Sequence, residues 1–259
     1  MARKTKPKRP PKRVILFIVE GQSDKIALEM PMKTWLEEID PTLKVEFLVA
    51  KTDVTSDWRN NPQNIEKKIN TYYFEPFFEM TPGIMRKDIV EVVQICDLDG
   101  TFIPDECCRA FDEAHFADDG YIYDPPYVYG KTADEVIARN QRKANNIRHL
   151  SGLSSIKVET KTCPYSVFFF SSNIEHYIYD KLNVEESSEK VALARKFANQ
   201  CDDDPDWFMR RMCRHSQALK GMTHEESWAY IMDGANSVKR HTNFNLCLKN
   251  LLTRIQGES

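Results

Sequence analysis

Three short apolar segments within residues 1–100 have the pattern of strands in a parallel sheet. Residues 13–19 (R-V-I-L-F-I-V) and 88–96 (D-I-V-E-V-V-Q-I-C) are almost continuously apolar and rich in β-branched side chains, as strands buried on both faces are. Residues 44–50 (K-V-E-F-L-V-A) alternate like a second strand, and residues 24–39 and 64–79 have the pattern of helices. The repeated order of strand and helix predicts a Rossmann-like α/β fold, with a mainly parallel sheet flanked by helices.

The pattern changes along the rest of the chain. Residues 101–131 contain prolines, tyrosines and turn signals, and they predict an excursion from the domain. Thr132 and Glu135 can form a capping box, which predicts a helix over residues 132–150. After one or two more strands over residues 157–171, the sequence favours only helices. We therefore expect three parts: a basic flexible arm (residues 1–12), an α/β domain (residues 13–183) and a C-terminal helical appendage (residues 184–259).

The charge of the chain is nearly balanced, but it is unevenly distributed. The formal net charge is −3, whereas residues 2–13 contain seven Lys or Arg and no acid, with prolines between them. Proline disfavours a helix, so this segment is expected to be extended and mobile. A basic arm of this kind either binds the phosphates of nucleic acid or only keeps the protein in solution.

The apolar segments and the cysteines indicate where the protein works. No segment reaches the roughly 18 apolar residues that cross a bilayer, so we expect no membrane association. The seven cysteines are scattered and include no C-x-x-C pair. They fit free thiols better than disulfides or a zinc site, and the sequence therefore predicts a cytoplasmic protein.

Two acidic clusters follow predicted strands, and a glycine follows each cluster: Glu20-Gly21 and Asp97-Leu98-Asp99-Gly100. Ligands bind at the carboxyl ends of the strands in open α/β sheets. Side chains at positions i and i+2 of an extended segment point the same way, so Asp97 and Asp99 can converge on one ion. Carboxylates are the ligands that Mg²⁺ prefers, and the pair of clusters predicts a site for Mg²⁺ or Mn²⁺. The alternative is that these residues only form turns.

The ordered motifs resemble the Toprim domain, and in particular the RloB-like and OLD-type phage-defence nucleases. A third segment, Ser172-Asn173-Ile174-Glu175, resembles the stretch in RloB-like proteins where an acid at a helix start joins the site, although the spacing differs from the commoner form. The resemblance covers residues 13–183. It implies a Toprim-like fold and a Mg²⁺-dependent nuclease acting on DNA or RNA, with a possible protein partner in antiviral defence. It also implies roles for seven residues: metal binding and catalysis by Glu20, Asp97 and Asp99, metal binding by Glu175, and support from Gly21, Gly100 and Asn173.

Two other functions fit the same residues. Asp97-Leu98-Asp99-Gly100-Thr101 matches the D-x-D-G-T signature of haloacid-dehalogenase-like phosphatases, in which the first Asp is the nucleophile. That signature normally lies on the first strand of its domain, whereas here two strand-like segments precede it. The third possibility is a non-catalytic module that binds metal to hold a regulatory or partner surface.

The helix predicted over residues 132–150 carries several basic side chains. Arg139, Arg142 and Lys143 are spaced so that they share one side of this helix. We expect them either to contact the phosphates of nucleic acid or to form an ordinary solvated face.

Overall fold

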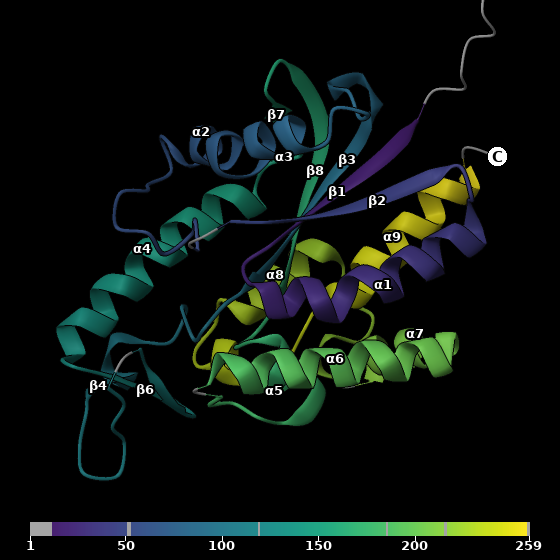
Figure 1. The fold of residues 1–259 in the computed structure, drawn as a ribbon. Helices are drawn as coiled ribbons and strands as arrows, with labels where there is room; N and C mark the ends of the chain where they lie inside the picture. Colours follow the sequence, from purple (N-terminus) through teal and green to yellow (C-terminus); the bar gives the residue numbers. More distant parts are fainter. Residues whose placement is uncertain (1–11, 51–52, 119, 185, 215–216, 258–259) are drawn as a thin grey trace, which may run out of the picture.

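A five-stranded sheet with the order β2-β1-β3-β8-β7 forms the centre of the protein. The computed structural model describes residues 12–50, 53–118, 120–184, 186–214 and 217–257. Neighbouring strands are parallel from β2 to β8, and β7 is antiparallel at the edge (Figure 1). The strands are β1 (Arg13–Val19), β2 (Leu43–Val49), β3 (Ile89–Asp97), β7 (Ser155–Val158) and β8 (Lys161–Phe170). The α/β fold and the mainly parallel sheet that the sequence predicts are therefore confirmed.

The register of the sheet brings the carboxyl ends of three strands together, along the edge of the sheet where the parallel strands end. Ile18 of β1 pairs with Leu48 of β2 on one side and with Gln94 of β3 on the other. Asp97, the last residue of β3, pairs with Phe170, the last residue of β8. The chain segments that leave β1, β2 and β3 consequently begin side by side, which is the place where an open α/β sheet binds ligands.

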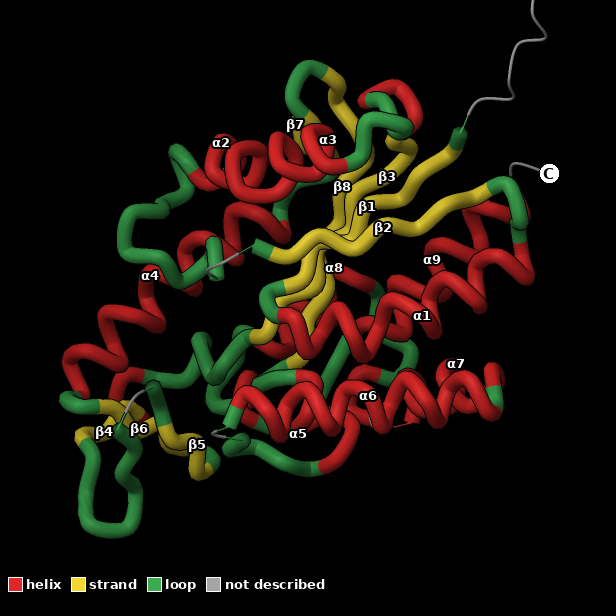
Figure 2. The backbone as a smooth tube through the Cα atoms, viewed as in Figure 1, coloured by secondary structure: helices red, strands yellow, loops and turns green. Residues whose placement is uncertain are grey.

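Helices cover both faces of the sheet. Figure 1 shows α2, α3 and α4 on one face and α1, α6, α7 and α9 on the other, and Figure 2 shows the strands running between these two layers. A short π-helical segment joins α2 to α3. The helices are α1 (Gln22–Ile39), α2 (Ile65–Ile69), α3 (Glu75–Met80), α4 (Ala133–Ser151), α5 (Ile174–Tyr179), α6 (Ser187–Asp203), α7 (Pro205–Arg214), α8 (His224–Ile231) and α9 (Phe244–Gly257).

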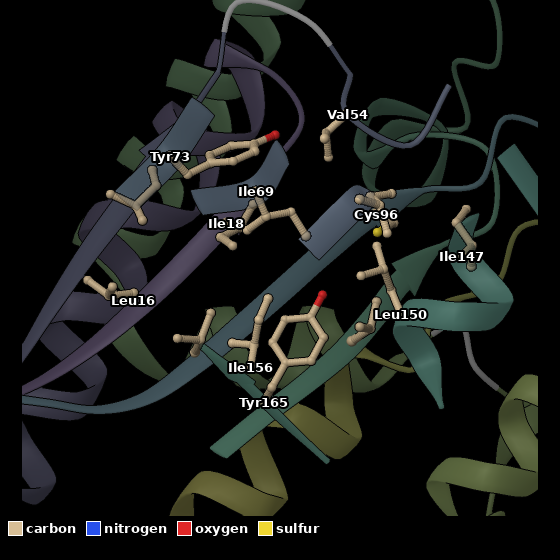
Figure 3. Packing of buried hydrophobic residues seen from close by; sticks show 14 of the residues in the cluster. Leu16, Ile18, Val54, Ile69, Tyr73, Cys96, Ile147, Leu150, Ile156 and Tyr165 are labelled. Atoms are coloured by element: carbon tan, nitrogen blue, oxygen red, sulfur yellow. The ribbon is translucent and has the colours of Figure 1, made fainter. Parts of the chain in front are cut away.

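Each face of the sheet has its own hydrophobic core. On one face, side chains of β1 and β3 pack against α4; Figure 3 shows Leu16, Ile18, Cys96, Ile147 and Leu150 in this cluster. On the other face, β1 and β2 pack against α1 and against the C-terminal helices α6, α7 and α9. The helices after residue 184 are thus part of the core of the α/β domain.

The predicted excursion forms a small second sheet. It has the strand order β4-β6-β5, and it packs against the start of α4. Its strands are β4 (Cys108–Ala110), β5 (Ile122–Asp124) and β6 (Tyr127–Gly130). This sheet lies downstream of the Asp97-Asp99 segment and forms a wall beside the carboxyl end of β3.

In the described part of the chain, none of the helices combines the length and the apolar character that crossing a bilayer requires.

Candidate metal centre

Three carboxylates from three neighbouring strands meet at this edge of the sheet. Glu20 directly follows β1, Asp99 lies two residues beyond β3, and Asp53 lies in the segment after β2. One oxygen from each acid lies within 4.8 Å of an oxygen of the other two. We call Glu20, Asp53 and Asp99 the acidic triad. The side chains are 12 %, 21 % and 27 % exposed, so water still reaches the group from one side.

Lys143 of α4 contacts all three acids of the triad. Its Nζ lies 3.1 Å from Glu20 Oε2, 3.0 Å from Asp53 Oδ2 and 2.7 Å from Asp99 Oδ2. The lysine side chain is 0 % exposed. A buried ammonium is costly unless it is paired, and here three carboxylates surround it.

Burial and neighbouring charges shift the pKa values of Glu20, Asp53 and Lys143. Burial, the charge of Asp53 and, more weakly, that of Asp99 raise the pKa of Glu20 well above its ordinary value, against the opposing effect of Lys143. Burial also disfavours the charged form of Asp53, but the Lys143 ammonium and the hydroxyls of Thr55 and Ser56 lower its pKa overall. The lysine responds in the opposite sense. Its burial favours the neutral amine, yet the three acids raise the pKa of Lys143 well above its ordinary value and keep it charged.

The segment after β2 is held in place from two directions. The N–H and O–H groups of Thr55 donate to Asp53 Oδ1, at 2.7 Å and 2.6 Å. The side-chain amide of Asn146, on α4, donates to Thr55 O at 2.9 Å. The Asn60 amide donates to Val54 O at 2.8 Å. Asp53 is therefore fixed by its own turn and by the helix that carries Lys143.

The turn after β3 places Asp99 by an unusual backbone conformation. Asp99 has a φ of +50° and Gly100 a φ of +67°, and both lie in the left-handed region that non-glycine residues rarely adopt. A Cβ at Gly100 would lie 2.5 Å from a methyl carbon of Val238, so only glycine fits there. Arg139 supports the turn by donating to Asp99 O at 2.8 Å. Such strain at a strand end is common at functional sites.

Asp97 lies next to the triad but belongs to a second acidic group. Burial raises the pKa of Asp97 well above its ordinary value, and the charge of Asp24 adds to this effect. Burial also raises the pKa of Asp24 to about 7, with a further contribution from Glu175. Glu175 is 4 % exposed, and its Oε1 has no hydrogen-bond partner among the described residues. Asp97, Asp24 and Glu175 thus form an electrostatically linked group beside the triad.

Asn173 and Glu175 have the local arrangement expected from the sequence. Asn173 is the N-cap of α5, and its side-chain oxygen accepts from His176 N at 2.7 Å. The cap fixes the start of the helix on which Glu175 lies, and Ser23 donates to the Glu175 carboxylate. The structure brings Glu20 and Asp99 into one cluster, and it places Asp97 and Glu175 in the neighbouring one. The metal-binding roles of all four residues stay predictions.

A cavity of about 470 Å³ opens beside these acids. Its walls come from the carboxyl end of β3, the small second sheet, the segment between α5 and α6 and the first turn of α6. They include Asp97, Asp99, Tyr121, Tyr123, Asn183 and Lys190. The volume lies within the range of about 300–1,000 Å³ that is typical of small-ligand sites. A ligand in this cavity would reach Asp97 and Asp99 directly.

No family model, curated protein or solved structure matches the chain. The fold and the chemistry of the acids are therefore what indicates its function.

The residues of the triad suit a divalent cation. Three carboxylates offer the hard oxygen ligands that Mg²⁺ and Mn²⁺ take, and each comes from the segment that follows a different strand of the sheet. Neighbouring ligands on one Mg²⁺ ion are about 3 Å apart, given metal–oxygen distances of 2.0–2.1 Å. Small movements of the triad would reach this spacing, because its oxygens are already within 4.8 Å of one another.

The basic side chains predicted to contact nucleic acid have other partners in this structure. Lys143 is fully buried among the acids, and Arg139 is 7 % exposed with its guanidinium on Asp99 O and Tyr123. Arg142 donates to Ser56 O at 2.8 Å. The side chains of Lys143 and Arg139 point toward the acids at the carboxyl end of the sheet, and the contact of these residues with nucleic-acid phosphates stays a prediction.

Sequence reasoning missed Asp53 and Asp24 and predicted a different role for Lys143, although each of the three left a signal. Asp53 follows a predicted strand, as Glu20 and Asp97 do, but the intervening residues hid the relation. Asp24 lies one helical turn after Glu20. Lys143 lies on the buried side of α4, in line with Val136 and Asn140 and followed by Ile147 and Leu150. A lysine on an apolar stripe at helical spacing predicts a buried cation, and this pattern can be read without a structure.

Proposed function

We propose that this chain is a nuclease that uses Mg²⁺ or Mn²⁺ to hydrolyse phosphodiester bonds of DNA or RNA. The observation that carries the proposal is the acidic triad, in which three strand-end carboxylates lie within 4.8 Å of one another beside an open cavity. The resemblance of the ordered acidic motifs to Toprim nucleases supports the same activity. It also suggests antiviral defence as the setting, with a possible protein partner.

The residues have separate tasks in this account. Glu20, Asp53 and Asp99 would hold the ion, which supplies charge stabilisation at the phosphate and acidifies an attacking water. Asp97 lines the cavity next to Asp99. Burial first, and then the charge of Asp24, raise the pKa of the Asp97 carboxyl, so it binds a proton more readily than an ordinary aspartate does. Asn173 would orient Glu175 at the border of the site through the α5 cap.

The phosphatase alternative has less support. In that mechanism Asp97 must be an ionised nucleophile, and a lysine normally stabilises it. Lys143 contacts Asp99, and no contact between Lys143 and Asp97 is present among the described residues. Glu20, which has no task in that mechanism, lies in the same cluster as Asp99.

The test is cleavage of DNA and RNA by the purified chain with Mg²⁺, with Mn²⁺ and with a chelator. We expect cleavage only with the metals, and we expect Glu20→Gln and Asp97→Asn each to abolish it. Glu37→Gln, which changes an exposed acid of α1, is the matched control and should remain active. Hydrolysis of small phosphate esters that survives Glu20→Gln but not Asp97→Asn would overturn the proposal in favour of the phosphatase.

A further inference from the structure

The ammonium of Lys143 stands where an ion shared by the acidic triad would stand. Its Nζ lies between 2.7 Å and 3.1 Å from one oxygen of each acid. The side chain is fully buried, and α4 delivers it from the side of the sheet opposite to α1. The triad therefore already has a cation, and this cation belongs to the chain itself.

The hydrogen bonds that Asp53 accepts limit how it can bind an ion. Asp53 Oδ1 accepts from both the N–H and the O–H of Thr55. Asp53 consequently offers only Oδ2 to an ion, and Oδ2 is the oxygen that contacts Lys143 at 3.0 Å. A metal bound by all three acids would have to lie within about 2.0–2.1 Å of that oxygen. The ammonium and the metal would then compete for one place and repel each other at short range.

We propose that Lys143 is the resident cation of the acidic triad, and that a divalent ion loads by displacing its ammonium from the three carboxylates. This inference rests on the proposed function, since it concerns how the same site acquires its metal. Without metal, the lysine neutralises part of the charge of the triad and keeps the strand ends together. With metal, the lysine side chain leaves the triad and becomes reachable from solvent.

The displacement can be followed by the reactivity of Lys143 toward an amine-acetylating reagent. The full chain is labelled first and then digested, and mass spectrometry of the peptides identifies the acetylated lysines. We expect Lys143 to remain unmodified in chelator and to become acetylated when Mg²⁺ or Mn²⁺ is added. Lys67, an exposed lysine of α2, is the internal control and should react equally in both conditions. Metal binding with continued protection of Lys143 would overturn the proposal.

A variant gives a second measurement on the same competition. Lys143→Met keeps the length of the side chain and removes its charge, and Lys67→Met is the matched control. Calorimetric titration with Mg²⁺ should show affinity about 5- to 150-fold higher for Lys143→Met than for the wild type. The ammonium and the metal compete for the same acids, and the coupling between two binding events typically changes an affinity by a factor of this size. Equal affinities would also contradict the proposal.

The two measurements separate this inference from the proposed function. If neither the wild type nor Lys143→Met binds Mg²⁺ or Mn²⁺, the proposal of a metal-dependent nuclease and the proposal of displacement are both wrong. If both proteins bind metal with equal affinity while Lys143 stays protected, only the displacement is wrong. Labelling of the wild type keeps the test valid even where Lys143→Met folds poorly.

Discussion

At the scale of single residues, the acids differ in how well the fold tolerates their charge. Asp53 has a lysine and two hydroxyls to stabilise its carboxylate, whereas Asp24 has mainly the N–H of Gly21, at 2.8 Å. Asp24 is 6 % exposed, and burial and the charge of Glu175 raise its pKa to about 7. The native protein without metal therefore holds a proton on Asp24 at a pH where the unfolded chain does not.

This difference makes stability depend on pH. A carboxyl with a raised pKa in the folded state favours folding at low pH, and this contribution is lost as the pH rises from about 4 to about 7. We expect Asp24→Asn to remove the loss, because asparagine is neutral and can still accept from Gly21 N. In chelator, the difference in the free energy of unfolding between the variant and the wild type should increase in favour of the variant by on the order of 4 kcal/mol from pH 4 to pH 8. Denaturant unfolding at several pH values measures it, and a pH-independent difference would count against the protonated Asp24.

At the scale of elements, α4 organises the site. It supplies Lys143 to the triad, Arg139 to the turn that carries Asp99 and Asn146 to the segment that carries Asp53. The amphipathic pattern predicts this helix, and its N-cap Thr132 accepts from Glu135 N as expected. The three polar contacts were not predictable in the same way, because they depend on which strand ends the buried side of α4 faces.

The contact of Asn146 with the Asp53 segment can be tested within the same helix. Asn146→Ala removes the donor to Thr55 O and leaves a buried carbonyl without it. We expect a loss of about 1–3 kcal/mol in the free energy of unfolding and weaker Mg²⁺ binding, since only its own turn then holds Asp53. Asn145→Ala, at the neighbouring exposed position, is the matched control. If the two variants are equally stable and bind Mg²⁺ equally, α4 does not position Asp53.

The strands were more predictable than the connections between them. The apolar segments over residues 13–19 and 88–96 match β1 and β3 within one residue at each end, because strands buried on both faces are marked by composition alone. The last two strands, expected over residues 157–171, form a hairpin of β7 and β8 that begins earlier. That turn contains no glycine or proline, so its position carries no sequence signal.

At the scale of the whole molecule, the C-terminal helices are needed for the core. Phe197, Phe208 and Phe244 are 0–1 % exposed, and they belong to the same cluster as Phe17 and Phe47 of the sheet. The sequence suggests a soft boundary near residue 184, but packing continues across it. The loss of the strand signal marks a change of secondary structure and reveals nothing about which surface the following helices cover.

A chain that ends at residue 183 should therefore fail to fold cooperatively. It would expose the apolar face that α6, α7 and α9 cover, and each large side chain exposed there costs about 1.5–3 kcal/mol. Thermal unfolding followed by circular dichroism, together with dye binding to exposed apolar surface, measures this. A sharp transition and low dye binding for the shortened chain would show that residues 13–183 fold alone.

The basic arm predicted over residues 1–12 lies almost wholly outside the described residues; only Lys12 is described, and its Nζ donates to Gly83 O at 2.5 Å. Residues 2–12 contain six Lys or Arg and no acid. If the arm binds phosphates, deleting residues 2–12 should lower the slope of log affinity against log salt by up to about 4 for single-stranded nucleic acid. Binding isotherms at several salt concentrations measure the slope. An unchanged slope would mean that the arm serves only solubility.

The central claim is that Glu20, Asp53 and Asp99 share a divalent ion, and the position of Mn²⁺ tests it most directly. Anomalous scattering from crystals of the full chain grown with Mn²⁺ locates the ion independently of activity. We predict a peak about 2.0–2.3 Å from one oxygen of each acid, with the Lys143 ammonium withdrawn from the triad. A Mn²⁺-containing crystal with no peak there, and with Lys143 still on all three carboxylates, would contradict the account.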